Sequence, residues 1–316
     1  MNRNLLSFFF IALCGLLHAS DNSIIDKHLK KINAVDKKGY AGIKNIDFIY
    51  TINLDKRPEK FNHCLEQLVP FGIVPFRFSA INGWEKPVSE LNDLGVKYKP
   101  EMIKDLWGTC YFEEDHGQPH HEILHVPGRN YFSHCMSRGA IAIVLSHLSI
   151  LKDAYNSSYK TIWVMEDDIQ VIKNPHLISS LIKELNHLVG ENKWDILFTD
   201  QDTKNNNGQY VPCRAYARRP NFTPAHPERF AAAPHNVSST LRKVTARYGA
   251  YSMIVSRAGM KKLLDFFRRY NIFLPYDMEF YLPNDMQLYS VTEDIVSTTP
   301  NSPSDNGGPG YSKIKA

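Results

Sequence analysis

The sequence has few cysteines, little net charge and no internal repeat. Its 316 residues include five cysteines, and no two of them stand in a CxxC spacing. This disfavours a structural zinc site or a redox motif. The formal net charge is only +4, and no block of lysine and arginine stands out. A nucleic-acid partner is therefore not expected.

The cysteines leave two interpretations open. Besides Cys14 near the N-terminus, the chain has Cys64, Cys110, Cys135 and Cys213. In an exported protein these four residues would form two disulfides, in one of three pairings. Buried free thiols are the alternative.

Long hydrophobic runs are also scarce, and the one present is at the N-terminus. Arg3 precedes a mainly apolar run from Leu5 to Leu17, which ends at small residues. The run is short for a bilayer-spanning helix, which needs about 20 residues. It is typical of a secretory signal, so residues 1–20 are predicted to be a signal peptide or, if uncleaved, a membrane anchor. We expect the protein to be exported, or to associate with a membrane through this segment.

Along the rest of the chain, apolar strands alternate with amphipathic helices, which predicts an α/β fold. Residues 21–45 are polar and lysine-rich, typical of a linker or a loose first helix. Residues 46–297 are predicted to form one catalytic domain, and residues 298–316 a flexible tail rich in Ser, Pro and Gly. Two stretches, 84–137 and 201–245, are expected to be long and irregular. Strands are expected near 47–54, 74–78, 161–165, 194–198 and 250–255, and helices from Pro58 and over 141–155, 177–188 and 260–267.

Three consecutive carboxylates come directly after the strand at 161–165. Glu166, Asp167 and Asp168 would lie at its carboxyl end, where open α/β sheets bind ligands. Adjacent negative charges repel one another, and a hard divalent cation with oxygen ligands would compensate them. The simpler alternative is a polar turn after a strand.

A second motif suggests a different metal. The residues from His121 to His125 read HEILH, which matches the zinc-hydrolase pattern of two histidines one helical turn apart with Glu122 as the base. Pro119 and Pro127 leave less than two turns of helix for it. An exported zinc metallohydrolase therefore stays an alternative that the local sequence disfavours.

Several segments resemble glycosyltransferase family 25, the lipopolysaccharide-type enzymes related to procollagen galactosyltransferases. They keep the family's order and cover roughly residues 46–296. The segments that resemble family motifs are Ile52–Glu59 (INLDKRPE), Phe78–Gly83 (FSAING), Gly139–Leu148 (GAIAIVLSHL), Val164–Asp168 (VMEDD), Trp194–Leu197 (WDIL), Gly249–Leu264 (from GAY to KLL) and Leu274–Asp277 (LPYD).

The resemblance implies a GT-A-like fold: a Rossmann-type mixed sheet flanked by helices. It implies transfer of a sugar, often galactose, from a UDP-sugar to a hydroxyl of a glycan, lipopolysaccharide or protein, with inversion. It also implies a divalent metal, Mn²⁺ or Mg²⁺. A non-catalytic carbohydrate-binding relative is the remaining alternative. Because bacterial nucleotide sugars are cytoplasmic, the cytoplasmic face of the inner membrane is an alternative location.

By position, the resemblance also assigns roles to individual residues. Asp168 and Glu166 would hold the metal. Asn53, Arg57, Glu166 and Asp167 would contact the nucleotide sugar, and Asp277 would act as general base. Structural alternatives are a turn cap for Asn53, a solvated helix start for Arg57 and a helix cap for Asp277. Ala140 and Ala142 depart from the family pattern, which usually has glutamate and glycine there.

Overall fold

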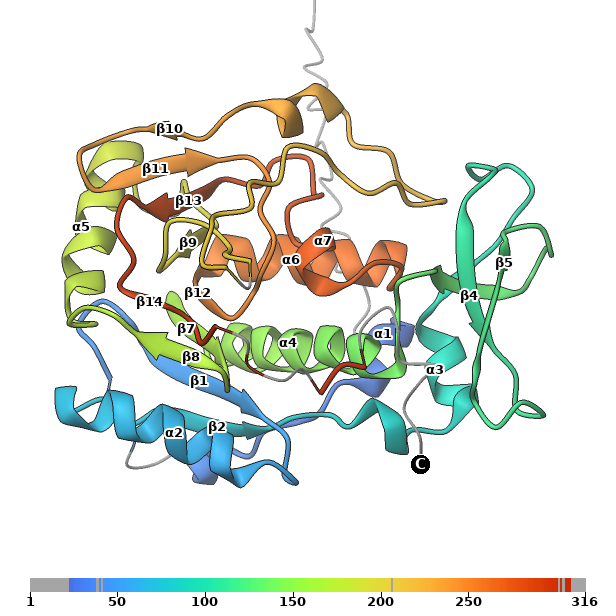
Figure 1. Cartoon of the computed structure of the whole chain (residues 1–316), viewed down its shortest axis with the longest axis horizontal. Coiled ribbons are helices and arrows are strands. Elements are labelled where there is room, and N and C mark those ends of the chain that lie inside the picture. The colour runs from blue at the N-terminus through green and yellow to red at the C-terminus, as the bar shows by residue number, and fades with distance from the viewer. Residues whose placement is uncertain are drawn as a thin grey trace, which may run out of the picture.

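A computed structural model describes residues 23–37, 40, 42–205, 207–300, 302 and 305–307 (Figure 1). The predicted signal or anchor at residues 1–20 lies outside the described residues. Within the described part, no helix has both the length and the apolarity needed to span a bilayer.

The core is a mixed sheet of eight strands flanked by helices, as predicted. Its strand order is β10-β11-β13-β9-β12-β7-β1-β2. Strands β2, β1 and β7 run parallel to one another, β12 is antiparallel to both β7 and β9, and β13 is parallel to β9. The strands are β1 (Phe48–Asn53), β2 (Phe76–Ser79), β7 (Thr161–Glu166), β9 (Ile196–Phe198), β10 (His235–Asn236), β11 (Leu241–Val244), β12 (Ser252–Ser256) and β13 (Leu288–Val291).

Alternating residues of the central strands pack into two cores, one on each face of the sheet. In β7, Ile162 and Val164 belong to one core, while Trp163 and Met165 belong to the other. The first core is completed by α4 (Arg138–Asn156) and α6 (Arg257–Tyr270), the second by α2 (Pro58–Leu68) and α5 (Leu177–Val189). A strand buried on both faces must be apolar throughout, which explains the uninterrupted apolar run of β7.

The four cysteines in the described part of the chain are free thiols, so no disulfide forms among them; Cys64, Cys110 and Cys213 are buried and Cys135 is partly buried. Burial raises the pKa of Cys64 to about 12 and that of Cys110 to about 11. These two thiols are therefore protonated packing residues and not nucleophiles.

The expectation of an irregular stretch at 84–137 was wrong. It contains α3 (Val88–Leu94) and a separate four-stranded sheet in the order β3-β6-β4-β5. This sheet lies at the opposite end of the molecule from α5 (Figure 1). Its strand β5 lacks a buried face, so it has none of the apolar alternation that predicts a strand. The strands are β3 (Val96–Lys97), β4 (Trp107–Tyr111), β5 (Pro119–Ile123) and β6 (Asn130–Ser133).

The remaining elements are short. Residues 21–45, expected as a linker or loose first helix, include α1, whose Asp26 forms an ion pair with Arg268 of α6. The stretch at 201–245 includes η4, β10 and β11, while α7 carries Asp277. The elements not yet given are α1 (Ile24–His28), η1 (Ala34–Lys37), η2 (Val69–Phe71), η3 (Gly83–Glu85), β8 (Ile169–Val171), η4 (Pro227–Ala231), α7 (Tyr276–Glu279) and β14 (Val296–Thr298).

Candidate active site

The three parallel strands β2, β1 and β7 end at the same edge of the sheet, and a pocket opens there. Its empty volume, counted with the open solvent at its mouth, is about 660 Å³. The chain leaving β1 contributes Leu54, that leaving β2 contributes the segment 80–84, and that leaving β7 contributes Glu166, Asp167 and Asp168. The acidic trio therefore lies where the α/β pattern predicts a ligand.

Helix α4 fixes the wall formed by residues 80–84. The Ser146 hydroxyl accepts a hydrogen bond from the backbone N–H of Ile81 at 3.0 Å. The Arg138 guanidinium donates to the carbonyls of Gly83, Trp84 and Lys86. Because both side chains come from a 19-residue helix packed on the sheet, this wall is held rigidly beside the acidic trio.

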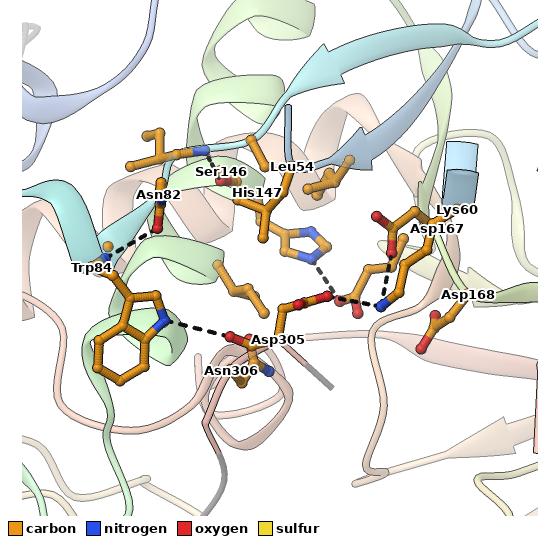
Figure 2. A pocket seen from close by; sticks show the side chains of 17 residues that line it. Leu54, Lys60, Asn82, Trp84, Ser146, His147, Asp167, Asp168, Asp305 and Asn306 are labelled. Carbon is orange, nitrogen blue, oxygen red and sulfur yellow. Dashed lines mark hydrogen bonds and ion pairs between the residues drawn. The ribbon is translucent and has the colours of Figure 1, made fainter. Parts of the chain in front are cut away.

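Two of the three carboxylates have clear partners, and Figure 2 shows one of these contacts, between Asp167 and Lys60. Glu166 lies 3.2 Å from the imidazole Nε2 of His147, and that ring stacks on Tyr276 with centroids 4.1 Å apart. Asp167 accepts a 2.7 Å hydrogen bond from the Asn53 amide and lies 3.9 Å from the Lys60 ammonium. These contacts fix the orientation of both side chains.

Asp168 is different. Its Oδ1 is shielded from solvent and has no hydrogen-bond partner among the described residues. Burial, followed by the charges of Glu166 and Asp167, raises the pKa of Asp168 to about 7. A desolvated carboxylate beside two others is under-compensated, and this arrangement suits a hard cation with oxygen ligands.

The structure also limits how many ligands the protein supplies. Across the described residues, no group of three or more His, Cys, Asp or Glu side chains is arranged to hold a metal. Mg²⁺ and similar ions at phosphate sites commonly take one or two carboxylates and complete their shell with phosphate and water. Asp168 and Glu166, which line the same pocket, fit that smaller donor set.

Asp277 lies in an adjoining hollow that shares Ile143, Glu166 and Asn306 with the main pocket. Its carboxylate accepts a 3.1 Å hydrogen bond from the N–H of Gly249. Gly249 has φ +78°, and a Cβ there would lie 2.5 Å from the Tyr251 ring, so the turn requires glycine. Burial raises the pKa of Asp277, which brings this carboxylate closer to the range useful for a base.

The other two predicted nucleotide contacts do not line the pocket. The buried Asn53 amide donates to Asp167 and to the Arg57 carbonyl, and its oxygen accepts from the Arg77 guanidinium. It therefore braces Asp167. The Arg57 guanidinium forms ion pairs with Glu59 and Asp305 at the pocket's rim.

Sequence patterns gave no assignment for three other pocket residues. Lys60 lies one turn into α2 and faces both Asp167 and Asp305. Asp305 and Asn306, from the segment predicted as a flexible tail, line the pocket as well. A Ser/Pro/Gly-rich composition carries no signal for such a tertiary contact. The sequence did carry one signal for Lys60. It follows Arg57 by three residues at a predicted helix start, a spacing that places the two side chains on the same side.

The HEILH motif does not form a zinc site. It begins on the strand β5, so His121 and His125 are not one helical turn apart. Glu122 accepts hydrogen bonds from Arg129 and from the Tyr131 hydroxyl. Burial raises its pKa, but these two partners outweigh burial and lower it overall. The alternative of a zinc hydrolase is therefore wrong on geometry.

Fold and pocket together define an α/β protein with an acidic pocket at the carboxyl edge of its main sheet. The family model described as glycosyltransferase family 25 (LPS biosynthesis protein) matches residues 46–280. The chain belongs to glycosyltransferase family 25.

Two relatives show the same likeness over shorter stretches. A glycosyltransferase 25 family member of Aedes aegypti is 25% identical over 153 residues, which are 48% of this chain and 21% of the relative. A glycosyltransferase 25 family member of Drosophila melanogaster is 24% identical over 164 residues, or 52% of this chain and 22% of the relative. The match thus spans about a fifth of each of these longer proteins.

Proposed function

We propose that this protein transfers a sugar from a UDP-sugar donor to an acceptor hydroxyl, with a divalent cation held by Asp168 and Glu166. The observation that carries the proposal is that Asp168, which lines the pocket at the carboxyl edge of a family 25 fold, has a desolvated oxygen without a hydrogen-bond partner in the described part of the chain. Such an oxygen is costly to keep in a folded protein unless a ligand uses it.

Each acidic side chain then has a separate task. Asp168 supplies the free carboxylate oxygen, and Glu166 supplies a second one held in place by His147. Asp167 stays with Asn53 and Lys60 and keeps the chain after β7 in position. When bound, Mn²⁺ or Mg²⁺ would offset the negative charge that develops on the departing diphosphate.

Asp277 is proposed as the general base that removes the acceptor proton. It lies in the adjoining hollow, next to Glu166 and outside the main pocket. A base there would activate an acceptor hydroxyl on the side of the sugar away from the nucleotide. A single displacement with inversion requires attack from that side. Burial raises the pKa of Asp277, which makes the carboxylate a stronger base than an exposed aspartate.

The donor and acceptor are proposed from the family resemblance. UDP-galactose is the first donor to test, and the acceptor is a hydroxyl on a glycan, lipopolysaccharide or protein. The N-terminal segment would place the enzyme outside the cytoplasm or at a membrane. The aromatic Trp84 and the aliphatic Ile81 and Ile143 give the pocket an apolar side suited to an organic ligand.

The test is a screen of UDP-sugars for release of UDP, with Mn²⁺, with Mg²⁺ and with EDTA. We expect release from one or a few donors, lost with EDTA and restored by added metal. Release that persists in EDTA would overturn the role given to the cation. Binding of UDP without release from any donor, even with acceptor glycans present, would favour a non-catalytic carbohydrate-binding relative.

A further inference from the structure

A short piece of the C-terminal segment, residues 305–307, lies across the candidate active site. The Asp305 carboxylate forms ion pairs with Arg57 and, at 2.9 Å, with Lys60. Its backbone carbonyl lies 3.5 Å from the indole Nε1 of Trp84 (Figure 2). The next residue, Asn306, accepts a hydrogen bond from the Ser137 hydroxyl through its carbonyl. The segment therefore touches three separate walls of the pocket.

The first turn of α4 leaves room for this segment at Gly139, and we call this contact surface the seat of the segment. A Cβ on Gly139 would lie 2.8 Å from the Asn306 carbonyl oxygen and 2.9 Å from its Cα. Both neighbours are backbone atoms, which cannot swing aside as a long side chain would. The segment thus fits only because residue 139 has no side chain.

The two cations that hold Asp305 stand at the start of α2, where helix α2 also presents its positive end. Lys60 lines the pocket and faces the acidic trio. Although burial raises the pKa of Asp305, the hydrogen bond and charge of Lys60, and then those of Arg57, hold it below its ordinary value. The carboxylate is accordingly ionised, and it acts as an anion seated between two cations.

We propose that Arg57 and Lys60 form the position that receives the donor's diphosphate, and that the Asp305 carboxylate occupies this position until the donor displaces it. The inference rests on the proposed function for the identity of the anion. It adds Lys60 to the donor site and gives the terminal segment the role of a built-in competitor.

The donor would displace the Asp305 carboxylate because the two carry charges of the same sign. A diphosphate placed beside Lys60 would add at least two negative charges next to Asp305 and Asp167. Unit charges 4 Å apart near a protein surface interact strongly, and here the repulsion would cancel much of the attraction to the two cations. Once Asp305 moves away, Arg57 and Lys60 are both available to the incoming diphosphate. The Asp305 carboxylate and the diphosphate therefore exclude each other from this position.

The experiment is calorimetric titration of the full chain with inorganic pyrophosphate, with Mg²⁺ and with EDTA, in wild type and four variants. Asp305→Asn removes the competing charge, and Gly139→Ala blocks the seat of Asn306 while leaving every charge in place. Lys60→Ala removes a cation of the proposed position. Glu293→Gln is the control, because it removes a carboxylate from an exposed ion pair with Lys173 outside this pocket.

We expect Asp305→Asn and Gly139→Ala to bind pyrophosphate about fivefold more tightly than wild type, and Lys60→Ala about tenfold more weakly, as for partly exposed ion pairs. Glu293→Gln should match wild type. If Asp305→Asn and Gly139→Ala bind pyrophosphate equally or more weakly, the segment is not a competitor and the inference is overturned. Absence of pyrophosphate binding in all forms overturns it as well.

Titration with UDP in parallel separates this result from the proposed function. If pyrophosphate affinity changes as expected but UDP-sugars neither bind nor react, the anion position stands and the UDP-sugar proposal fails. If UDP-sugars react in wild type while Asp305→Asn leaves the affinities for UDP and pyrophosphate unchanged, the proposed function stands and this inference fails.

Discussion

Two regions of this molecule carry a metal-type motif, and they differ in how their carboxylates are paired. In the strand β5, Glu122 is held by Arg129 and Tyr131, and these partners lower its pKa. After β7, Asp168 keeps an oxygen without a partner among the described residues, and its pKa is raised to about 7. The first region better matches a familiar sequence pattern, yet the second is the one that we propose as the ligand site.

The comparison teaches that a motif supplies ligands only if the backbone leaves them unpaired and brings them into a hollow. The HEILH motif begins on β5, an edge strand of a small sheet with β4 on one side only, and its last two residues follow that strand. The acidic trio leaves a central strand and faces a pocket enclosed by segments from β1, β2 and α4. Both regions contain carboxylates, and their tertiary surroundings made the difference.

The largest expected effect comes from replacing the Asp168 carboxylate with an amide. Asp168→Asn should lower the rate of metal-dependent UDP release by at least about a thousandfold, or about 4 kcal/mol of transition-state stabilisation. His121→Ala, in the other region, should stay within about twofold of wild type. Steady-state kinetics on both variants check this, and equal losses in the two would erase the distinction between the regions.

Asp277→Asn should lower kcat by about a hundredfold, because a positioned general base contributes on that scale. The variant should bind UDP as wild type does, since Asp277 lies in the adjoining hollow and not in the main pocket. Turnover measurements combined with calorimetry separate the two effects. A large loss of UDP affinity with kcat unchanged would contradict the assignment.

Stability should respond in the opposite sense in the two regions. Glu122→Ala should lower the free energy of unfolding by about 1–2 kcal/mol, because Arg129 and Tyr131 lose their shared acceptor. Asp168→Asn should raise it by about 1 kcal/mol without metal, because one of three repelling charges is removed. Urea denaturation in EDTA measures both values, and destabilisation by Asp168→Asn would argue for a structural carboxylate.

Metal binding should change the stability by a similarly small amount. At a Mn²⁺ concentration about tenfold above its dissociation constant, wild type should gain about 1.4 kcal/mol in unfolding free energy. His121→Ala should gain the same amount, and Asp168→Asn should gain none. Thermal melts with graded Mn²⁺ provide the comparison. A gain that depends on His121 instead of Asp168 would move the metal site to β5.

Most of the main sheet was predictable from sequence. The apolar runs at β1 and β7 and the amphipathic stripes of α2, α4 and α5 each marked an element buried against its neighbours. In the small sheet, β5 buries neither face and so has no periodic signal, while β3, β4 and β6 are short strands without an alternating apolar pattern. Within the site, the acidic trio was predictable because its strand was. Lys60 and Asp305 were not singled out, because their pairing joins residues 245 positions apart.

By itself, the sequence determined the alternation of strands and helices, the placement of Glu166, Asp167 and Asp168 at a strand end, and the family. Those properties depend on local pattern and on the order of short motifs, which the chain carries along its length. Only the tertiary structure decided which carboxylates found partners. It paired Glu122, left one buried Asp168 oxygen without a partner among the residues that the structure describes, and brought Asp305 next to two cations, because pairing depends on side chains that only folding brings together.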